Sequence, residues 1–294
     1  MLINQVSKTT GLTKKAIEYY TSQGLVSPSV FDNGYRDYSE NDVEALSKIF
    51  VLRRLDIGTD EIKTVLSDKS NTVLQVVSVR KELQLQREAA KRAILDQLSS
   101  GKTFGEIVEN LRTLENSKTI TEKLLDAFPG YYGRFVCLHF ARFLNEPIRT
   151  RNQQTAYETI VTFLDNVPAL NLTEELQEYL IEGTKHIGTE QIKDIVESTR
   201  KSIENPDNFL SANKEVLEQY LAYKQSEEYK KSPAFKITEL LKEFNNASGY
   251  YDVFIPALKQ LSSSYAEYCE SLETANEKLL AQYPEISKIS NWNE

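Results

Sequence analysis

Hydrophobic residues at the start of the chain recur at helical spacing and are interrupted by glycine after a few turns. Leu2, Ile3 and Val6 form one short apolar helix face, and the glycine that follows ends that helix. Thr13 is a good N-cap for a second helix over residues 14–20. Two short helices joined by a short turn that contains glycine predict a helix-turn-helix.

A small β-wing is predicted after the second helix. Pro28 imposes an extended backbone, and Asp32-Asn33-Gly34 is a strong turn signal. Residues 35–38 return as a short strand. Arg36 lies on that strand, where a guanidinium can reach the phosphate backbone of DNA.

Two further helices complete this predicted module. Ser39 and Asp42 resemble a capping box, and the helix that they open turns apolar residues such as Leu46 toward a core. Gly58 breaks that helix, and Thr59 is predicted to cap a last short one.

The hydrophobic pattern changes after the module. Residues 71–98 hold no glycine or proline, which predicts one long helix. Its apolar residues fall near a three-four repeat, in which small and polar residues take some of the positions: Val76, Val79, Leu83, Gln86, Ala90 and Ala93. Such a pattern is typical either of a dimerisation helix or of a linker helix packed against a second domain.

Beyond a linker at residues 99–102, the chain is predicted to form an all-α helical bundle. The expected helices cover residues 103–114, 119–128, 131–145, 151–165, 173–184, 189–203, 211–228, 234–246 and 252–282. The fold class is therefore mainly α. The domains are expected at residues 1–70 (winged helix-turn-helix), 71–100 (dimerisation helix) and 101–294 (helical bundle).

The net charge of -8 is unfavourable for a DNA-binding protein until it is divided along the chain. Residues 1–100 carry 14 Lys and Arg against 13 Asp and Glu, whereas the remainder carries 21 against 30. Because an acidic surface repels phosphate, DNA contact is expected only in the N-terminal module.

Three strings of residues between positions 2 and 68 keep fixed spacings. They read I-x-x-V-x-x-x-T-G-L-x-x-x-x-I-x-Y-Y-x-x-x-G-L-V-x-P, then N-G-Y-R-x-Y-S-x-x-D-V, then L-R-R-L-x-I-G-x-x-E-I-K-x-V-L. Together they resemble the DNA-binding domain of the MerR family. The resemblance implies a homodimer, joined by the long helix, that binds a pseudo-palindromic promoter. It also implies that the dimer distorts the promoter, so that RNA polymerase can align with both elements, and that it senses an effector through its C-terminal domain.

The candidate DNA contacts lie at the start of the second helix, on the paired tyrosines, on the wing and in the third string. Hydroxyl and ammonium groups at a helix N-terminus reach phosphates and base edges. With the residues that the resemblance adds, the candidates are Thr13, Lys14, Lys15, Tyr19, Tyr20, Arg36, Tyr38 and Arg54. One tyrosine of the Tyr19-Tyr20 pair is expected in the core. Of Tyr35 and Tyr38, the core position favours Tyr38.

One position departs from the family pattern. The family has arginine before the paired tyrosines, whereas this chain has Glu18. Since phosphate repels a carboxylate, Glu18 either points away from DNA or pairs with Lys14 or Lys15 at helical spacing. The preferred operator sequence is expected to differ from the usual one.

No catalytic site, cofactor or metal is predicted. The sequence holds no glycine-rich phosphate loop, no HExxH and no nucleophile elbow. Cys137 and Cys269 lie far apart, with His139 and His186 as the histidines, which does not match a zinc cage or the pattern of metal-sensing relatives. With no secretory signal and no apolar run of about 20 residues, the chain is expected in the cytoplasm, without a membrane partner.

Aromatic residues are concentrated in the C-terminal part, which holds 22 of the 29 within residues 119–294. Two segments there share a helix with leucines, a break, Gly-Tyr-Tyr, two residues and Phe. They supply six candidate effector contacts: Tyr131, Tyr132, Phe135, Tyr250, Tyr251 and Phe254. Aromatic faces with hydroxyl edges suit a flat or cationic organic compound. The alternative is that these residues only pack between helices.

Two functions remain open at this point. The first is a transcription regulator that binds promoter DNA as a homodimer and responds to a small organic effector. The alternative is a ligand-sequestering resistance protein whose DNA binding serves autoregulation. An enzyme fused to a DNA-binding module is a weaker third interpretation, because no reactive cluster is present in the sequence.

Overall fold

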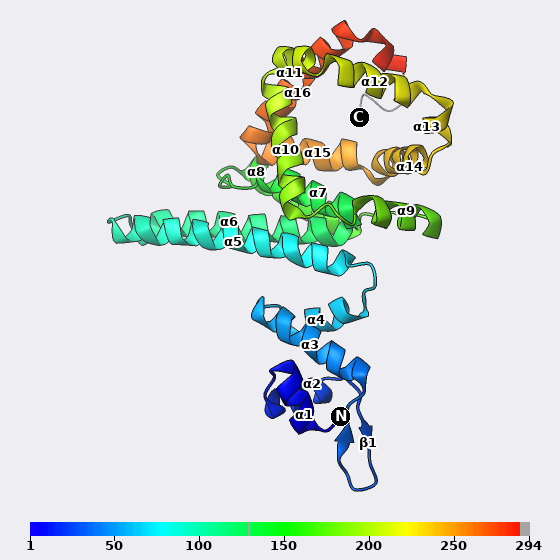
Figure 1. Ribbon diagram of the computed structural model, residues 1–294. Helices are drawn as coiled ribbons and strands as arrows, with labels where there is room; N and C mark the ends of the chain where they lie inside the picture. Colours follow the sequence, from blue (N-terminus) through cyan, green and yellow to red (C-terminus); the bar gives the residue numbers. More distant parts are fainter. Residues whose placement is uncertain (129, 289–294) are drawn as a thin grey trace. The chain divides into compact units, whose positions relative to one another are not determined.

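The computed structural model describes residues 1–128 and 130–288, and the chain divides into two compact units, Met1–Leu74 and Gln75–Glu294. We call the first unit the head and the second the body (Figure 1). Helices dominate both, and the sheet found among the described residues has two strands, so the mainly α fold class is confirmed. Within the described residues, no helix combines the length and the apolar character that a membrane crossing requires.

The head consists of four short helices and a wing, followed by the start of a long helix. Its elements are α1 (Ile3–Thr10), α2 (Lys14–Ser22), β1 (Ser29–Val30), β2 (Arg36–Asp37), α3 (Glu40–Arg54) and α4 (Thr59–Ser67). The two strands are antiparallel, with Ser29 opposite Asp37 and Val30 opposite Arg36. The predicted helix-turn-helix and wing are both present.

Local capping explains where these helices begin. The Thr13 hydroxyl accepts a hydrogen bond of 3.2 Å from the Ala16 amide, as its N-cap position predicts. Ser39 and Asp42 form the predicted reciprocal capping box of α3. The prediction for α4 was wrong by one residue, because Gly58 occupies the N-cap position and Thr59 is the first helical residue.

The helices and the wing of the head share one small core. Val6, Ile17, Leu46, Ile49 and Ile62 are fully buried, and they come from α1, α2, α3 and α4. The core therefore fixes the helix-turn-helix against the two helices that follow the wing.

The body is helical throughout its described part. Its elements are α5 (Thr72–Ser99, which starts in the head), α6 (Phe104–Ala127), α7 (Gly130–Ala141), α8 (Arg151–Asn166), α9 (Glu174–Thr184), α10 (Thr189–Glu204), α11 (Pro206–Ala212), α12 (Lys214–Gln225), α13 (Glu227–Lys231), α14 (Pro233–Ser248), the π-helical turn η1 (Tyr250–Phe254), α15 (Ile255–Leu261), α16 (Ser263–Gln282) and the 3-10 turn η2 (Pro284–Lys288).

Three predicted boundaries in the body were wrong. Phe104–Ala127 form one helix instead of two, because no glycine or proline occurs at residues 115–118, where the break was predicted. The single helix expected over residues 211–228 is replaced by α11, α12 and α13, and α16 starts only at Ser263. Serine side chains set the new starts of α13 and α16: Ser226 accepts from the Tyr229 amide, and Ser262 from the Tyr265 amide.

The main core of the body lies between α5, α6, α7, α8, α10, α15, α16 and the π-helical turn. The backbone of α7 at Gly133 packs directly against the backbone of Phe128. A Cβ added to Gly133 would lie 1.5 Å from the Phe128 carbonyl oxygen. A smaller cluster joins α11, α12 and the end of α16 through Leu210, Leu221 and Tyr283. The body thus has a packed centre and a separate peripheral cluster.

The long helix α5 uses its apolar stripe differently from the prediction. Val79 and Leu83, predicted for the repeat, are buried in the body's own core. α5 and α6 run side by side in opposite directions (Figure 1), linked by Arg80 with Asp126 and by Asn110 with Gln97. The large apolar residues that remain exposed on α5 and α6 are therefore not the ones that the repeat predicted.

Candidate nucleic-acid interface

The start of α2 presents two free-standing cationic side chains. Lys14 and Lys15 are both exposed in the first turn of the helix. Thr13 is exposed as well, although its hydroxyl is already an acceptor for the helix cap. Amide groups and ammonium groups at a helix N-terminus favour phosphate, so this turn has the chemistry of a DNA-backbone contact.

The paired tyrosines have different environments. Tyr19 is 48% exposed, whereas Tyr20 is buried in the head core, as expected for one member of the pair. Their rings are in edge contact, with centroids 5.5 Å apart. Tyr20 therefore holds the exposed Tyr19 in place, and only Tyr19 can offer its ring and hydroxyl to a ligand.

Glu18 lies exposed on the same helix. Among the described residues it forms no ion pair, so the expected pairing with Lys14 or Lys15 is not present. A negative charge beside Tyr19 consequently remains on this face of α2.

The wing exposes a different set of side chains from the one predicted. Arg36 is exposed on β2, as expected. Tyr38 is 1% exposed and lies in the head core, as favoured over Tyr35, so its place among the candidate DNA contacts was wrong. Tyr35 is 65% exposed instead, and Phe31 is exposed beside it at the wing turn, where Gly34 has a φ of 83°. The strand ends at Asp37, so side-chain alternation does not extend to Tyr38.

Two adjacent arginines at the end of α3 have separate roles. Arg53 donates a hydrogen bond of 2.8 Å to the Ile57 carbonyl and closes the helix. Arg54 is exposed, and its guanidinium stacks on the Phe50 ring at 4.8 Å. Arg54 keeps all its donors available for phosphate, whereas one donor of Arg53 is used within the chain.

Comparisons with known proteins agree with these features. The family model described as MerR HTH family regulatory protein matches residues 1–69. The HTH-type transcriptional regulator CueR of Yersinia pestis is 41% identical over 68 residues, which are 23% of this chain and 49% of that protein. The HTH-type transcriptional regulator HmrR of Sinorhizobium medicae (strain WSM419) is 36% identical over 100 residues, which are 33% of this chain and 68% of that protein. The chain belongs to the MerR family.

A third MerR relative is the heavy metal-dependent transcription regulator 2 of Rhizobium meliloti (strain 1021). It is 35% identical over 96 residues, which are 31% of this chain and 65% of that protein. The chain thus spans about half of CueR and less than two thirds of this regulator. All three matches extend over a third of this chain or less, so they concern the head and the start of the body.

The cysteines of this MerR chain lie in apolar surroundings. Cys137 and Cys269 are both buried free thiols. Burial raises the pKa of Cys137 to about 12, so the thiolate that a metal requires is disfavoured at neutral pH. In the part of the chain that the structure describes, no group of three or more His, Cys, Asp or Glu side chains could hold a metal ion.

His139 lies in an aromatic environment. Its imidazole stacks on Phe135 and meets the edges of Phe140 and Phe143. Burial, assisted by the charge of Arg142, lowers the pKa of His139 to about 4. The histidine is therefore neutral at pH 7 and packs, partly buried, among aromatic rings.

The six aromatic residues considered for an effector site are packed between helices. Tyr250 and Phe254 are core residues of the π-helical turn. The other four, Tyr131, Tyr132, Phe135 and Tyr251, are partly buried against the same core. All six thus pack against the main core, and their role as effector contacts stays a prediction.

Proposed function

We propose that this chain is a cytoplasmic DNA-binding transcription regulator whose head contacts promoter DNA through α2 and the wing. The observation that carries the proposal is the set of exposed cations on a MerR-type winged helix-turn-helix. Lys14 and Lys15 open α2, Arg36 lies on the wing and Arg54 ends α3. Duplex DNA is recognised in this way by winged helix-turn-helix modules, with phosphate contacts that fix the register.

We further propose that the regulator acts as a homodimer through the α5–α6 pair. Large apolar side chains are exposed along this pair: Leu85, Leu95, Phe104, Val108 and Leu111. Exposed apolar residues of this size favour burial against another surface. A second copy of the chain would also supply the second head that a pseudo-palindromic promoter requires. In this arrangement RNA polymerase is affected through the distorted promoter.

The body is proposed to bind a small organic effector. Support comes from two pockets along α10 and α16, of about 310 Å³ and about 520 Å³, which fall within the range typical of small-molecule sites. The larger pocket is lined by apolar residues such as Phe209, Leu217 and Leu272. If the body instead sequesters its ligand, the ligand would bind in the same pockets. Adding the ligand would then leave transcription unchanged at every promoter except that of the chain's own gene.

The DNA-binding proposal is tested with Lys15→Ala and Arg36→Ala. Each substitution removes a phosphate contact, so the affinity for a duplex carrying the promoter of the chain's own gene should fall. The slope of log affinity against log salt concentration should decrease by about 1 for each cation lost. Fluorescence anisotropy at three or more salt concentrations measures both quantities.

Lys48→Ala is the matched control. Lys48 is an exposed lysine of the same head, paired with Glu44 along α3 and outside the proposed interface. It should leave both the affinity and the salt slope unchanged. If Lys15→Ala and Arg36→Ala behave like this control, α2 and the wing are not the DNA-binding surface.

A further inference from the structure

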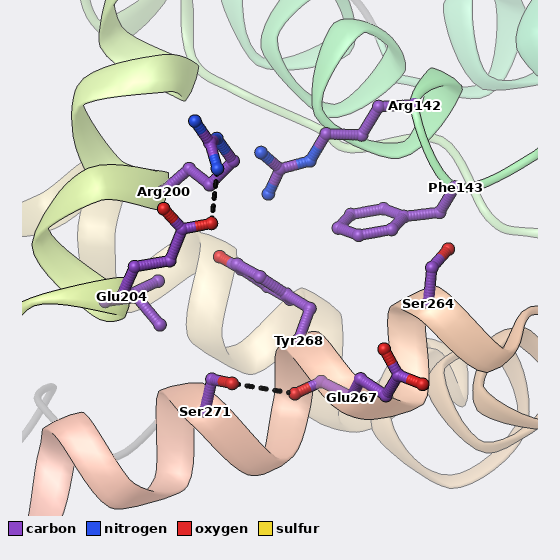
Figure 2. Close-up of a pocket in the computed structure, with 9 residues that line it drawn as sticks. Arg142, Phe143, Arg200, Glu204, Ser264, Glu267, Tyr268 and Ser271 are labelled. Carbon is purple, nitrogen blue, oxygen red and sulfur yellow. Dashed lines mark hydrogen bonds and ion pairs between the residues drawn. The ribbon is translucent and has the colours of Figure 1, made fainter.

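A pocket lies where three helical segments of the body meet. Arg142 and Phe143 follow the end of α7, Arg200 and Glu204 belong to α10, and Tyr268 belongs to α16 (Figure 2). Its volume is about 310 Å³, at the lower end of small-molecule sites. The pocket contains none of the DNA-binding candidates and none of the six aromatic residues considered above.

Arg142 is held in this pocket by rings. Its guanidinium carbon lies 4.5 Å from the centre of the Phe143 ring and 4.9 Å from that of Tyr268. In the described part of the chain, its Nε and Nη2 atoms are shielded from water and have no hydrogen-bond acceptor. A buried donor without an acceptor is unfavourable, and the cost is greater for a charged group.

The second arginine of the pocket is already neutralised. Arg200 donates hydrogen bonds of 2.8 and 2.7 Å to Glu197 and also pairs with Glu204. Figure 2 shows the pair of Arg200 with Glu204 to one side of the Arg142 guanidinium and the Glu267 carboxylate turned away from it. Among the described residues, Arg142 is therefore the cation of this pocket that forms no ion pair, although the charge of Glu197 acts on it from a distance.

The two nitrogens without acceptors have the geometry of a specific ligand group. Nε and Nη2 form one edge of the planar guanidinium, and this edge matches the two oxygens of a carboxylate. Arg142 is hydrogen-bonded to Tyr268, and its Nε and Nη2 edge is the part left without an acceptor, so this edge is the one that a ligand in the pocket would use. The rings of Phe143 and Tyr268, with the side chain of Ile203, supply apolar contacts for a flat body.

We propose that this pocket binds a small aromatic carboxylate, with Arg142 pairing with the carboxylate and Phe143 and Tyr268 flanking the ring. The proposal names the effector class and rests on the proposed function of the body as a sensor. It replaces the cationic compound that the aromatic content and acidic charge favoured. A ligand in this position contacts α7, α10 and α16 at once, and it thereby stabilises one arrangement of these helices.

The first test compares three probes on the full chain by isothermal titration calorimetry. Benzoate has the ring and the carboxylate, benzamide has the ring without the charge, and inorganic phosphate has a charge without the ring. We expect benzoate to bind about tenfold or more tightly than either of the others, because a charge-assisted pair and ring contacts are both needed. Equal binding of benzoate and benzamide overturns the role of Arg142, and equal binding of phosphate overturns the aromatic part.

The second test uses variants of the pocket. Arg142→Gln should weaken benzoate binding about tenfold or more. Ser271→Trp places a bulky ring on an exposed pocket residue and should block benzoate without disturbing the core. Arg151→Gln, an exposed arginine at the start of α8, is the control and should bind benzoate as the wild type does. Unchanged benzoate affinity in Arg142→Gln and Ser271→Trp overturns the proposal, and the tryptophan variant decides if Arg142→Gln does not fold.

DNA binding is measured on the same samples. Arg142→Gln without benzoate should bind promoter DNA as the wild type does, because the head carries the contacts. Loss of benzoate binding with intact DNA binding is the result expected of the variants. If the wild type itself fails to bind benzoate but binds DNA, only the ligand assignment is overturned. If it binds benzoate but not DNA, the proposed function is overturned and the pocket assignment stands.

Discussion

The carboxylate of Glu146 connects two parts of the body through several hydrogen bonds. It lies in the connection between α7 and α8 and accepts hydrogen bonds from the first residues of α16. The Ser262 hydroxyl donates at 2.7 Å, and the backbone amides of Ser263 and Ser264 donate at 3.0 and 2.8 Å. Burial alone would raise the pKa of Glu146, but the hydrogen bonds from Ser263, Ser264 and Ser262 outweigh it and hold the pKa at about 2.

We expect Glu146→Ala to lower the free energy of unfolding of the body at pH 7 by roughly 2–3 kcal/mol, the range for hydrogen bonds to a charged group. The folded-state pKa lies below the usual 4.5, so this stabilisation is complete above about pH 4.5 and is lost as the pH falls toward about 2. Urea denaturation of both proteins at pH 7 and pH 3 measures the change. A difference between the two proteins that is equal at both pH values contradicts the electrostatic explanation.

Single residues were predicted from the sequence where one local rule decides the outcome. Thr13 and Ser39 cap helices because a side-chain oxygen three residues from a free amide needs no distant partner. The core position of Tyr38 was favoured correctly, but its listing as a DNA contact was wrong, since a strand of two residues sets no alternation that would expose it. The surroundings of Arg142 are formed by residues far away in sequence, such as Tyr268, so no local sequence signal identifies this site.

At the scale of elements, Gly133 has the closest neighbour of the glycines described in the body. It lies in the first turns of α7, and the Phe128 carbonyl at the end of α6 occupies the space where a side chain would begin. Neither partner can move without shifting backbone, because α6 and α7 are both packed into the main core. The glycine thus sets the angle at which the chain turns from one helix into the next.

Gly133→Ala should therefore destabilise the body by about 3 kcal/mol or more, at the upper end of the cost of overpacking. Gly183→Ala is the control, because Gly183 lies in α9 with nothing within 4 Å of an added Cβ, and alanine favours helix there by up to about 1 kcal/mol. Thermal unfolding followed by circular dichroism distinguishes the two. Equal melting temperatures for both variants would show that the turn at Gly133 relaxes freely.

The order of the elements could be predicted from hydrophobic periodicity and from the positions of glycine and proline. The ends of some helices could not be predicted in this way. The winged module was predicted because its turns contain Asn-Gly or glycine. The long helix was predicted because neither glycine nor proline interrupts it. Ser226 and Ser262 end helices without either residue, by capping the next one. Serine also occurs inside helices, so its capping role is decided by tertiary packing that a sequence pattern does not contain.

At the scale of the whole molecule, the α5–α6 pair carries apolar side chains that face solvent. Phe104 is 77% exposed at the start of α6, and Val108 lies one turn further along the same helix. Of the residues that the repeat predicted for dimerisation, Val79 and Leu83 are instead enclosed in the chain's own core. Association is therefore expected to use the outer side of the pair.

We expect Phe104→Glu combined with Val108→Glu to raise the dissociation constant of the homodimer by about a hundredfold or more, because charges replace apolar contacts in the interface. Folding should be retained, since an acidic residue in the first turn of α6 is favourable to the helix. Sedimentation equilibrium measures the change. Tyr179→Glu, at an exposed aromatic position of α9, is the control and should leave association intact. A double variant that still sediments as a dimer would exclude this surface.

The separate cores of the head and the body have an evolutionary consequence. The residues that hold the winged module together all lie within Met1–Leu74, and the main core of the body is closed without them. Recombination near α5 can then exchange one body for another without disturbing the fold of the head. Under the proposed function, a lineage that carries this head would acquire responses to new compounds by changing its body alone.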